Sequence, residues 1–346
     1  MPADQPMTPA VLRALPKISL HNHLAGSIAA ETAVELARSY DVPLPDGRDA
    51  RTLYDHASYE DLGHFLEVYD IVGSSVRTAQ DFHRITYEML SDGARHGVLH
   101  REIFLSPSAH PQASYLTMLD GIAAAMADAQ ADHGITSRLI PAIHRQRSLG
   151  EAMELVQMVI DNRRDFVVGI GMDYSEADGP PHGFVDAYLL AKKAGLHRTA
   201  HSESGPPANI TFLLDEMGVE RVDHGYHVVT DALVLQRCVD ERIPFTCTPV
   251  SSDIGRYSGS GDGKHEKIAA MIAAGMVISI DGDDPPMFGT DPTKDLQVLV
   301  DAHGYDVGQV LALTENGIEA AWLDESDRAE LRERARLQAE LAVGLQ

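Results

Sequence analysis

The chain has 346 residues and carries 52 acidic against 28 basic side chains, a formal net charge of −24 at pH 7. This balance argues against partners such as nucleic acids or anionic membranes, because binding to either relies on clustered Lys and Arg. The only cysteines are Cys238 and Cys247, which excludes a disulfide framework and favours a reducing cytoplasm as the setting.

Eight short runs rich in β-branched and apolar residues recur along the chain, each bounded by polar turns. Several, such as FVVGIGM at 166–172 and MVISI at 276–280, are apolar at consecutive positions, which is typical of strands buried on both faces of a parallel sheet. The predicted strands are Lys17–His23, Leu99–Pro107, Ile135–His144, Phe166–Glu176, His197–Glu203, Arg221–Val228, Ile243–Ser252 and Met276–Asp283.

Segments with apolar residues at i, i+3 and i+4 separate most of these runs and predict amphipathic helices. Strand and helix alternate in the pattern of a (β/α)8 TIM barrel of the α/β class, which we predict as a single domain over residues 1–346. A doubly wound open sheet is the alternative, but no glycine-rich phosphate-binding turn follows the first strand. The helices predicted between strands are Gly121–Ala131, Leu149–Ile160, Gly183–Ala194, Ala208–Met217 and Asp231–Glu241.

The region between the first two strands, residues 28–97, has a mainly helical pattern. We expect it to form a helical lid over the barrel mouth. Residues 307–346 predict C-terminal helices with a solvated, charged face. The longest apolar stretch, Ile268–Ile280, falls short of the roughly 18 residues that a membrane-spanning helix needs. The helices expected in the lid are Ile28–Tyr40, Tyr59–Val76 and Ala79–His96.

Side chains of the types that bind metals lie at the ends of four predicted strands. The first strand ends in His21-Asn22-His23 and the fifth in His201-Ser202-Glu203. Residues i and i+2 of a strand project to the same face, so each pair can point into one pocket. The sixth strand carries Asp223-His224, and Asp283-Asp284 lie at the end of the eighth. The C-terminal ends of barrel strands form the active-site face of such folds, so we expect these groups to meet there.

Each pair alone also fits a buried core histidine or a solvated acidic turn. Four of them at one end of one barrel favour a shared site instead. Three or more His and Asp ligands around one divalent ion, with a position left open for water, describe a hydrolytic metal site. With 17 histidines against two cysteines, imidazole and carboxylate groups must hold any metal.

Longer motifs extend this picture, and with them the chain resembles the adenosine/adenine deaminase family of the metal-dependent amidohydrolase superfamily. The resemblance runs nearly end to end, from Leu15-Pro16-Lys17 to Glu319–Asp324. It is strongest toward the bacterial adenine-deaminase branch. The segments that carry it are Asp61–Leu66, Ser204–Pro207, Arg221–Gly225 and Asp283–Gly289.

The resemblance implies one bound Zn²⁺ ion, with another divalent ion as the alternative. It implies Glu203 as the general acid that protonates a purine ring nitrogen, and His224 as the group that orients the metal-bound hydroxide. Asp284 would hydrogen-bond the five-membered ring of the purine. This division of labour suits an aromatic amidine, which resists attack by hydroxide until its ring nitrogen receives a proton. The implied metal ligands are His21, His23, His201 and Asp283.

The chain departs from the family pattern mainly where the substrate is expected. His201-Ser202-Glu203 is one residue shorter than the family's usual connection between metal ligand and acid. Ala25 replaces an Asp, Glu or Asn that contacts substrate, Tyr174 replaces a small residue, and Asp281-Gly282 replaces Asn-Ser or Asn-Thr. Phe65 and Leu66 are expected to form an apolar wall over the ring. The predicted substrate contacts are therefore Ala25, Phe65, Tyr174 and Asp284.

These features predict a zinc-dependent hydrolytic deaminase of an adenine-type aminopurine, as base or nucleoside, that releases ammonia. One alternative is a divergent amidohydrolase acting on an N6-substituted purine or on a non-purine amidine or cyclic amide. Another is a non-catalytic homologue that only binds a ligand. The expected partner is a small purine-like molecule, with neither nucleic acid nor a membrane, and the sequence does not determine the oligomeric state.

Overall fold

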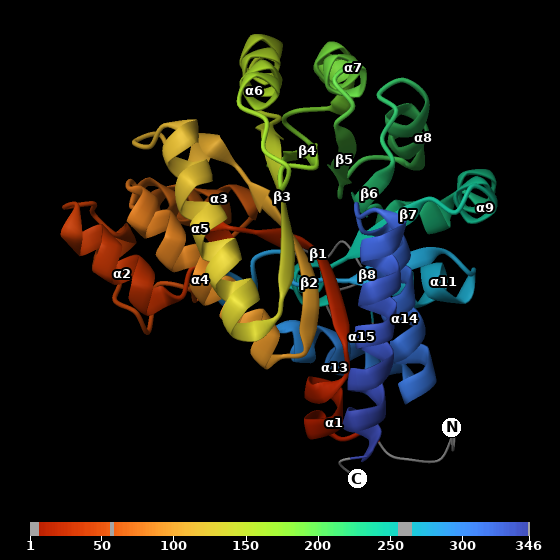
Figure 1. The fold of residues 1–346 in the computed structure, drawn as a ribbon. Helices are drawn as coiled ribbons and strands as arrows, with labels where there is room; N and C mark the ends of the chain where they lie inside the picture. Colours follow the sequence, from red (N-terminus) through yellow and green to blue (C-terminus); the bar gives the residue numbers. More distant parts are fainter. Residues whose placement is uncertain (1–6, 56–58, 255–264, 345–346) are drawn as a thin grey trace.

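A computed structural model describes residues 7–55, 59–254 and 265–344, so both ends of the predicted domain lie outside the described residues. Eight parallel strands pair in the order β1 to β8 and curl into a barrel surrounded by helices (Figure 1). This arrangement confirms the predicted (β/α)8 architecture. The strands are β1 Lys17–His23, β2 Val98–Leu105, β3 Thr136–His144, β4 Gly169–Asp173, β5 His197–Ser202, β6 Arg221–His224, β7 Pro244–Cys247 and β8 Val277–Ile280.

The barrel closes between β8 and β1 through a few hydrogen bonds. Asn22 and Asp283 form an isolated bridge, in which the Asp283 amide donates to the His21 carbonyl at 3.0 Å. The pairing of β1 with β2 is irregular between Ser19 and Asn22, and there the His21 amide donates to the Asp281 carboxylate at 3.0 Å. In a regular ladder the His21 amide would donate to a backbone carbonyl. Here the Asp281 carboxylate accepts this hydrogen bond instead and so fixes the backbone of His21.

The helices form the outer layer of the barrel and fill its two ends. Capping boxes begin α4, α6 and α14, in which Thr78, Ser148 and Asp306 bond the third residue of each helix. Helix α14 packs over β8 and β1 and so covers the seam. The helices are α1 Pro9–Ala14, α2 Ala30–Ser39, α3 Leu62–Ser74, α4 Ala79–Arg95, α5 Tyr115–His133, α6 Leu149–Asp161, α7 Val185–Lys193, α8 Pro207–Asp215, α9 Ala232–Asp240, α10 Pro249–Ile254, α11 Glu266–Ala273, α12 Pro285–Phe288, α13 Pro292–His303, α14 Val307–Ala320 and α15 Glu325–Gly344.

The helical insertion between β1 and β2 divides into two parts. Helix α4 packs against α5 and β2, and Figure 1 shows it alongside α5 in the outer layer. A Cβ atom at Gly121 of α5 would lie 2.2 Å from the Ala79 carbonyl, so glycine permits this close crossing. Helix α4 therefore serves as a barrel helix, whereas α3 supplies Leu62, Phe65 and other residues to the cavity at the mouth. A lid function for α2 and α3 stays a prediction.

Several strands end earlier than the sequence predicts. The expected Phe166–Glu176 and Arg221–Val228 stop at Asp173 and His224. Tyr174 and His224 have φ of 65° and 65°, and a residue in this left-handed region turns the chain out of the extended conformation. The expected Ile243–Ser252 stops at Cys247 because α10 begins two residues later at Pro249. Apolar patterning does not report these turns, because the residues stay buried beyond the end of the strand.

The opposite end of the barrel is closed by the segment between α14 and α15. There Arg221 pairs with Glu102 at 2.7 Å, and both side chains are fully buried. The Trp322 ring lies 4.1 Å from the Arg221 guanidinium, and the Trp322 backbone amide donates to Glu102 at 2.6 Å. Trp322 thus ties the segment between α14 and α15 to both members of a buried ion pair in the barrel. In the described part of the chain, no helix is both long and apolar enough to cross a bilayer.

Candidate active site

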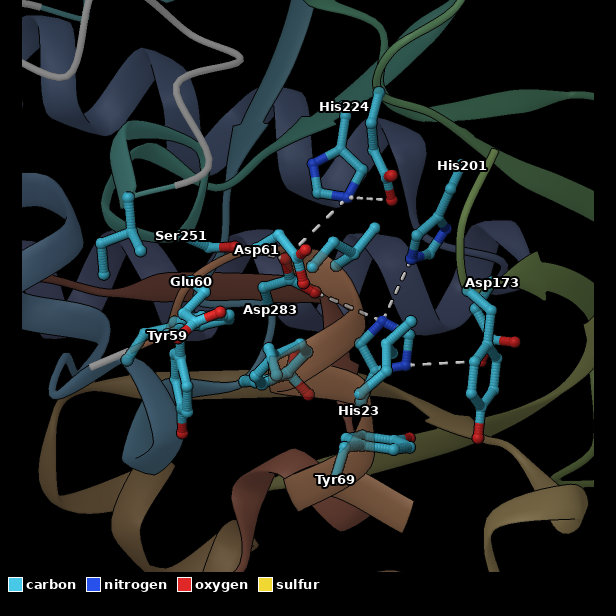
Figure 2. Close-up of a pocket in the computed structure, with 18 residues that line it drawn as sticks. His23, Tyr59, Glu60, Asp61, Tyr69, Asp173, His201, His224, Ser251 and Asp283 are labelled. Carbon is cyan, nitrogen blue, oxygen red and sulfur yellow. Dashed lines mark hydrogen bonds and ion pairs between the residues drawn. The ribbon is translucent and has the colours of Figure 1, made fainter. Parts of the chain in front are cut away.

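A cavity of about 410 Å³ opens at the C-terminal ends of the strands, within the size range of small-molecule sites. Figure 2 shows the His201 ring and the Asp283 carboxylate both facing His23. The strand ends contribute polar groups to this cavity, including His201 and Glu203, and α3 contributes Leu62, Phe65, Leu66 and Tyr69. The lining residues are His23, Tyr59, Glu60, Asp61, Leu62, Phe65, Leu66, Tyr69, Asp173, Tyr174, His201, Glu203, His224, Ser251, Ile254, Asp283, Asp284 and Phe288.

Four groups from three strand ends converge at the floor of the cavity. The Nε2 atoms of His21 and His23 each lie 3.1 Å from Nε2 of His201. Oδ1 of Asp283 lies 3.4 Å from the His21 nitrogen and 3.3 Å from the His23 nitrogen. The structure therefore brings together all four residues that the resemblance implies as metal ligands.

The geometry and charge of this cluster fit a divalent cation. Nitrogen and oxygen ligands bound to one tetrahedral Zn²⁺ lie roughly 3.3 Å apart, close to the separations found between these atoms. Burial opposes protonation of His23, but the carboxylates of Asp284, Asp283 and Asp173 outweigh it and raise the pKa of His23 to about 10. The surroundings thus favour positive charge at this point. These donors are the imidazole and carboxylate types that bind zinc in hydrolytic sites.

Residues behind the cluster contact Nδ1 of all three imidazole rings, through hydrogen bonds to His21 and His201 and a longer ion-pair contact to His23. Nδ1 of His21 lies 3.0 Å from the Thr246 hydroxyl, which donates to Asp223 at 2.8 Å. The same Asp223 carboxylate lies 3.2 Å from Nδ1 of His201. Nδ1 of His23 faces Asp173 at 3.6 Å. Carboxylates and hydroxyls in these positions select the tautomer that leaves Nε2 free for a metal.

Glu203 and His224 lie beside this cluster, on the wall of the cavity. Nε2 of His224 is 3.5 Å from Oε1 of Glu203 and 3.9 Å from Oδ2 of Asp283. The other oxygen of Glu203, Oε2, is buried and has no hydrogen-bond partner in the described chain. Burial raises the pKa of Glu203 to about 8 although Arg145 opposes this shift, so the carboxyl group holds a proton at neutral pH. The short connection from His201 thus still delivers an acid to the cavity.

Asp284 is also buried at the cavity wall, and its Oδ1 has no partner among the described residues. Burial and the adjacent Asp283 carboxylate raise its pKa well above the ordinary value. A Cβ atom at Gly26 would lie 1.6 Å from this Oδ1, so the loop after β1 accommodates the carboxylate only because residue 26 is glycine. Gly26 is a site residue that the sequence analysis missed.

Two of the other predicted substrate contacts line the cavity and one does not. Phe65 stacks on Phe288 with ring centroids 4.7 Å apart, and Leu66 lies beside them in the same wall. Tyr174 also lines the cavity, and its hydroxyl donates to Asp70 of α3 at 2.6 Å. Ala25 is buried in the hydrophobic core and is not among the lining residues. The structure therefore does not place Ala25 with the other predicted contacts.

Several further site residues escaped the sequence analysis. Asp173 ends β4 as His23 ends β1, so its position at a strand end was a usable signal. Ser251 donates to Oδ2 of Asp283 at 2.6 Å, but it lies in α10, where the sequence predicted a strand. Tyr59 and Tyr69 come from the insertion, and no local pattern separates them from packing residues.

The backbone is strained at three of the strand ends around the cavity. Tyr174, His224 and Asp283 have φ between 62° and 65°, a region that non-glycine residues seldom adopt. Each such residue costs of order 1–3 kcal/mol and persists only where its surroundings enforce it. This strain marks the mouth of the barrel as a functional region, since it aims His224 and Asp283 into one cavity.

Comparison with known proteins agrees with this geometry. The adenosine deaminase family model matches residues 16–337. Adenine deaminase of Vibrio parahaemolyticus is 34% identical over 93% of this chain and 96% of its own. The crystal structure of adenine deaminase from Arthrobacter aurescens is 31% identical, with a TM-score of 0.87 over 94% of this chain and 99% of that one. A zinc-bound amidohydrolase from Burkholderia ambifaria is 29% identical, with a TM-score of 0.88 over 99% of this chain and 96% of that one. The chain therefore belongs to the adenosine deaminase family.

Proposed function

We propose that this protein is a zinc-dependent hydrolase that removes the exocyclic amino group of adenine as ammonia. One observation carries the proposal: a four-ligand His and Asp cluster and a buried carboxyl group with an unpartnered oxygen share one cavity. The curated relatives named adenine deaminase, at 32–34% identity over most of their length, support adenine as the substrate. Placement in a reducing cytoplasm stays a prediction, motivated by two buried free thiols.

His21, His23, His201 and Asp283 are the proposed zinc ligands. The ion, when bound, supplies a nucleophilic oxygen from water at neutral pH. Zinc is favoured because nitrogen and carboxylate donors in this spacing suit it, and because a structural relative holds Zn in the same fold. Asp223, Thr246 and Asp173 orient the imidazole rings from behind.

The remaining polar groups of the chain handle the protons of the reaction. Glu203 donates a proton from Oε2 to a ring nitrogen of the purine, which makes the amino-bearing carbon electrophilic. His224, whose Nε2 lies near both Glu203 and Asp283, orients the attacking oxygen and stabilises the charge that develops. The tetrahedral centre then expels ammonia, so adenine and water yield hypoxanthine and ammonia. The free Oδ1 of Asp284 pairs with the five-membered ring.

The walls of the cavity suit a flat aromatic base. The stacked Phe65 and Phe288 rings, with Leu62 and Leu66, provide an apolar surface of the kind on which a heterocycle packs. The Tyr174 hydroxyl donates a hydrogen bond to Asp70, and the Tyr174 ring stacks on His144 with centroids 3.5 Å apart. Tyr174 therefore shapes this side of the cavity by its bulk. That bulk motivates the second candidate, an N6-substituted aminopurine.

The test is a substrate panel with the zinc-loaded protein. Adenine, adenosine, N6-methyladenine and a cyclic amide are incubated separately, while the ultraviolet spectrum and released amine are followed. We expect ammonia release from adenine at the highest rate. Faster release of methylamine from N6-methyladenine would support the second candidate. Failure of every compound to react, with one zinc bound per chain, would contradict both and favour a binding protein without activity.

A further inference from the structure

The segment that carries Glu203 is held by hydrogen bonds to a residue that does not line the cavity. Glu203 lies in the turn of residues 202–205, between β5 and the proline-led start of α8. Ser202 still pairs with β6, and its carbonyl accepts from the Gly225 amide at 2.9 Å, but residues 203–205 belong to no strand or helix that would fix the direction of the Glu203 side chain. The position of Glu203 must therefore be set by contacts around it.

Glu176, three residues after the end of β4, supplies these contacts. Its Oε2 accepts hydrogen bonds from the amides of Ser204 and Gly205, each at 2.8 Å. Its Oε1 accepts from the Asn209 side-chain amide at 2.8 Å and from the Ser202 hydroxyl at 3.5 Å. One carboxylate thus holds the chain on both sides of Glu203 and ties it to the first turn of α8.

The turn is shaped around this carboxylate. A Cβ atom at Gly205 would lie 2.5 Å from Oε1 of Glu176 and 2.1 Å from the Asn209 amide nitrogen. No side chain fits between the turn and its acceptor, so glycine at 205 is a steric requirement of the contact. This tight fit leaves the backbone next to Glu203 little freedom to shift.

Burial of the Glu176 carboxylate costs free energy that packing contacts alone would not offset. It is 3% exposed, and no ion pair joins it to a cation within the described parts of the chain. A buried carboxylate without a paired cation is costly unless hydrogen bonds replace its hydration. The four groups that donate hydrogen bonds to Glu176 all lie in the turn around Glu203 or at the start of α8. The hydrogen bonds that offset the cost of burying Glu176 therefore also hold this turn in place.

We propose that Glu176 is a positioning residue that fixes the turn of residues 202–205 and thereby holds Glu203 against the substrate ring nitrogen. This inference rests on the proposed function of Glu203 as general acid. Glu176 itself is not among the residues that line the cavity. Its removal should therefore impair proton donation while leaving the zinc ligands and the apolar wall in place.

The experiment compares Glu176→Ala with Glu176→Gln in the full-length, zinc-loaded protein, with adenine as substrate. For Glu176→Ala we expect kcat to fall on the order of 10²-fold, the effect of a displacement of about 1 Å in a catalytic group. KM for adenine and zinc content per chain should stay at wild-type values. Glu176→Gln should recover most of kcat, because its amide oxygen can accept both backbone amides while Asn209 rotates to accept from its nitrogen.

Two further variants keep the test decisive if Glu176→Ala does not fold. Gly205→Ala leaves Glu176 in place but inserts a methyl group between the turn and the carboxylate, so kcat should fall without loss of zinc. Asp178→Ala is the matched control, since this exposed acid lies in the same loop and, among the described residues, accepts a hydrogen bond only from the Gln146 side chain, at 3.4 Å. It should leave kcat unchanged.

Three results would overturn the inference: wild-type kcat in Glu176→Ala, equal loss in the Ala and Gln variants, or loss of zinc together with activity. Failure of the proposed function has a different signature, because the wild-type protein would then release no ammonia from adenine in the same assay. The wild-type measurement therefore separates the two.

Discussion

Both ends of the barrel bury charged side chains, but they do so in opposite ways. At the closed end, Glu102 and Arg221 pair at 2.7 Å, and Trp322 covers the guanidinium. At the mouth, oxygens of Glu203 and Asp284 remain without partners among the described residues. The mouth also carries the strained backbone of three strand ends, including Asp283.

The difference separates stability from function within one barrel. At the closed end the charges of Arg221 and Glu102 neutralise each other, although Nε and Nη2 of Arg221 have no hydrogen-bond partner among the described residues. Glu102 also ties the C-terminal segment to the strands by accepting from the Trp322 amide.

At the mouth, the Asp283 carboxylate already faces the His21 and His23 rings. By contrast, Oε2 of Glu203 and Oδ1 of Asp284 have no partner among the described residues and would gain one from a bound substrate. The free energy lost in burying them is the cost of a site organised before binding.

The largest effect is expected at the mouth, from Glu203→Gln. The amide keeps the shape of the side chain but has no acidic proton to give, so kcat for adenine should fall by about 10²–10⁴-fold. The thermal midpoint of the metal-free protein should not fall, because Oε2 of Glu203 has no hydrogen-bond partner in the described chain to lose, and the amide is neutral like the protonated acid that it replaces. Steady-state kinetics and calorimetry measure the two quantities. A variant that lost stability and kept its activity would reverse the assignment.

At the closed end, Arg221→Met should have the opposite signature. Removing one partner of a buried ion pair leaves Glu102 uncompensated and should lower the free energy of unfolding by about 3–5 kcal/mol. Denaturant titration measures this loss, and active-site titration with zinc corrects kcat for the folded fraction. That corrected kcat should match the wild type. If it instead fell along with stability, the two ends would not be independent.

The same pair predicts a difference in acid stability. Burial opposes ionisation of Glu102, but Arg221 and His100 outweigh it and lower its pKa from about 4.5 to about 2. A carboxyl group with a depressed folded-state pKa stabilises the protein above its unfolded pKa and loses this contribution as pH falls through the folded value. The stability gap between wild type and Glu102→Gln should therefore shrink between pH 4.5 and pH 2. Denaturant titrations across this range measure it, and a constant gap would contradict the account.

The smallest effect is expected from Tyr174→Phe, which removes only the hydroxyl that donates to Asp70. Loss of one such hydrogen bond costs about 1 kcal/mol of stability, and the ring that lines the cavity stays in place. The kcat/KM values for adenine and adenosine should then keep their wild-type ratio. Tyr174→Ser, which also removes the ring, is the comparison variant that should change this ratio.

The alternation of strands and helices around the barrel was predictable from the sequence. The strand β1 was predicted with its observed bounds, Lys17–His23. The groups gathered at the cavity follow from barrel geometry, since strand ends share one face. For this reason His201, Glu203 and Asp283 could be placed together before any coordinates were known.

Other features depend on contacts that sequence patterns do not encode. Glu176 and Gly26 act through distant partners, Ser204 and Asp284, and nothing local distinguishes them from ordinary loop residues. Ala25 was expected at the substrate because of its place in a motif, yet it is buried and is not among the residues that line the cavity. The direction of a side chain in a turn is decided by tertiary packing, which the alternation of polar and apolar residues does not report.

The most direct test of the central claim is a zinc titration of metal-free protein during hydrolysis of adenine. Zinc is added in substoichiometric steps, while hypoxanthine and ammonia are quantified at each step. The account predicts that activity rises linearly, stops rising at one zinc per chain, and yields the two products in equal amounts. Full activity in the metal-free protein, or no hydrolysis of adenine once one zinc is bound, would contradict it.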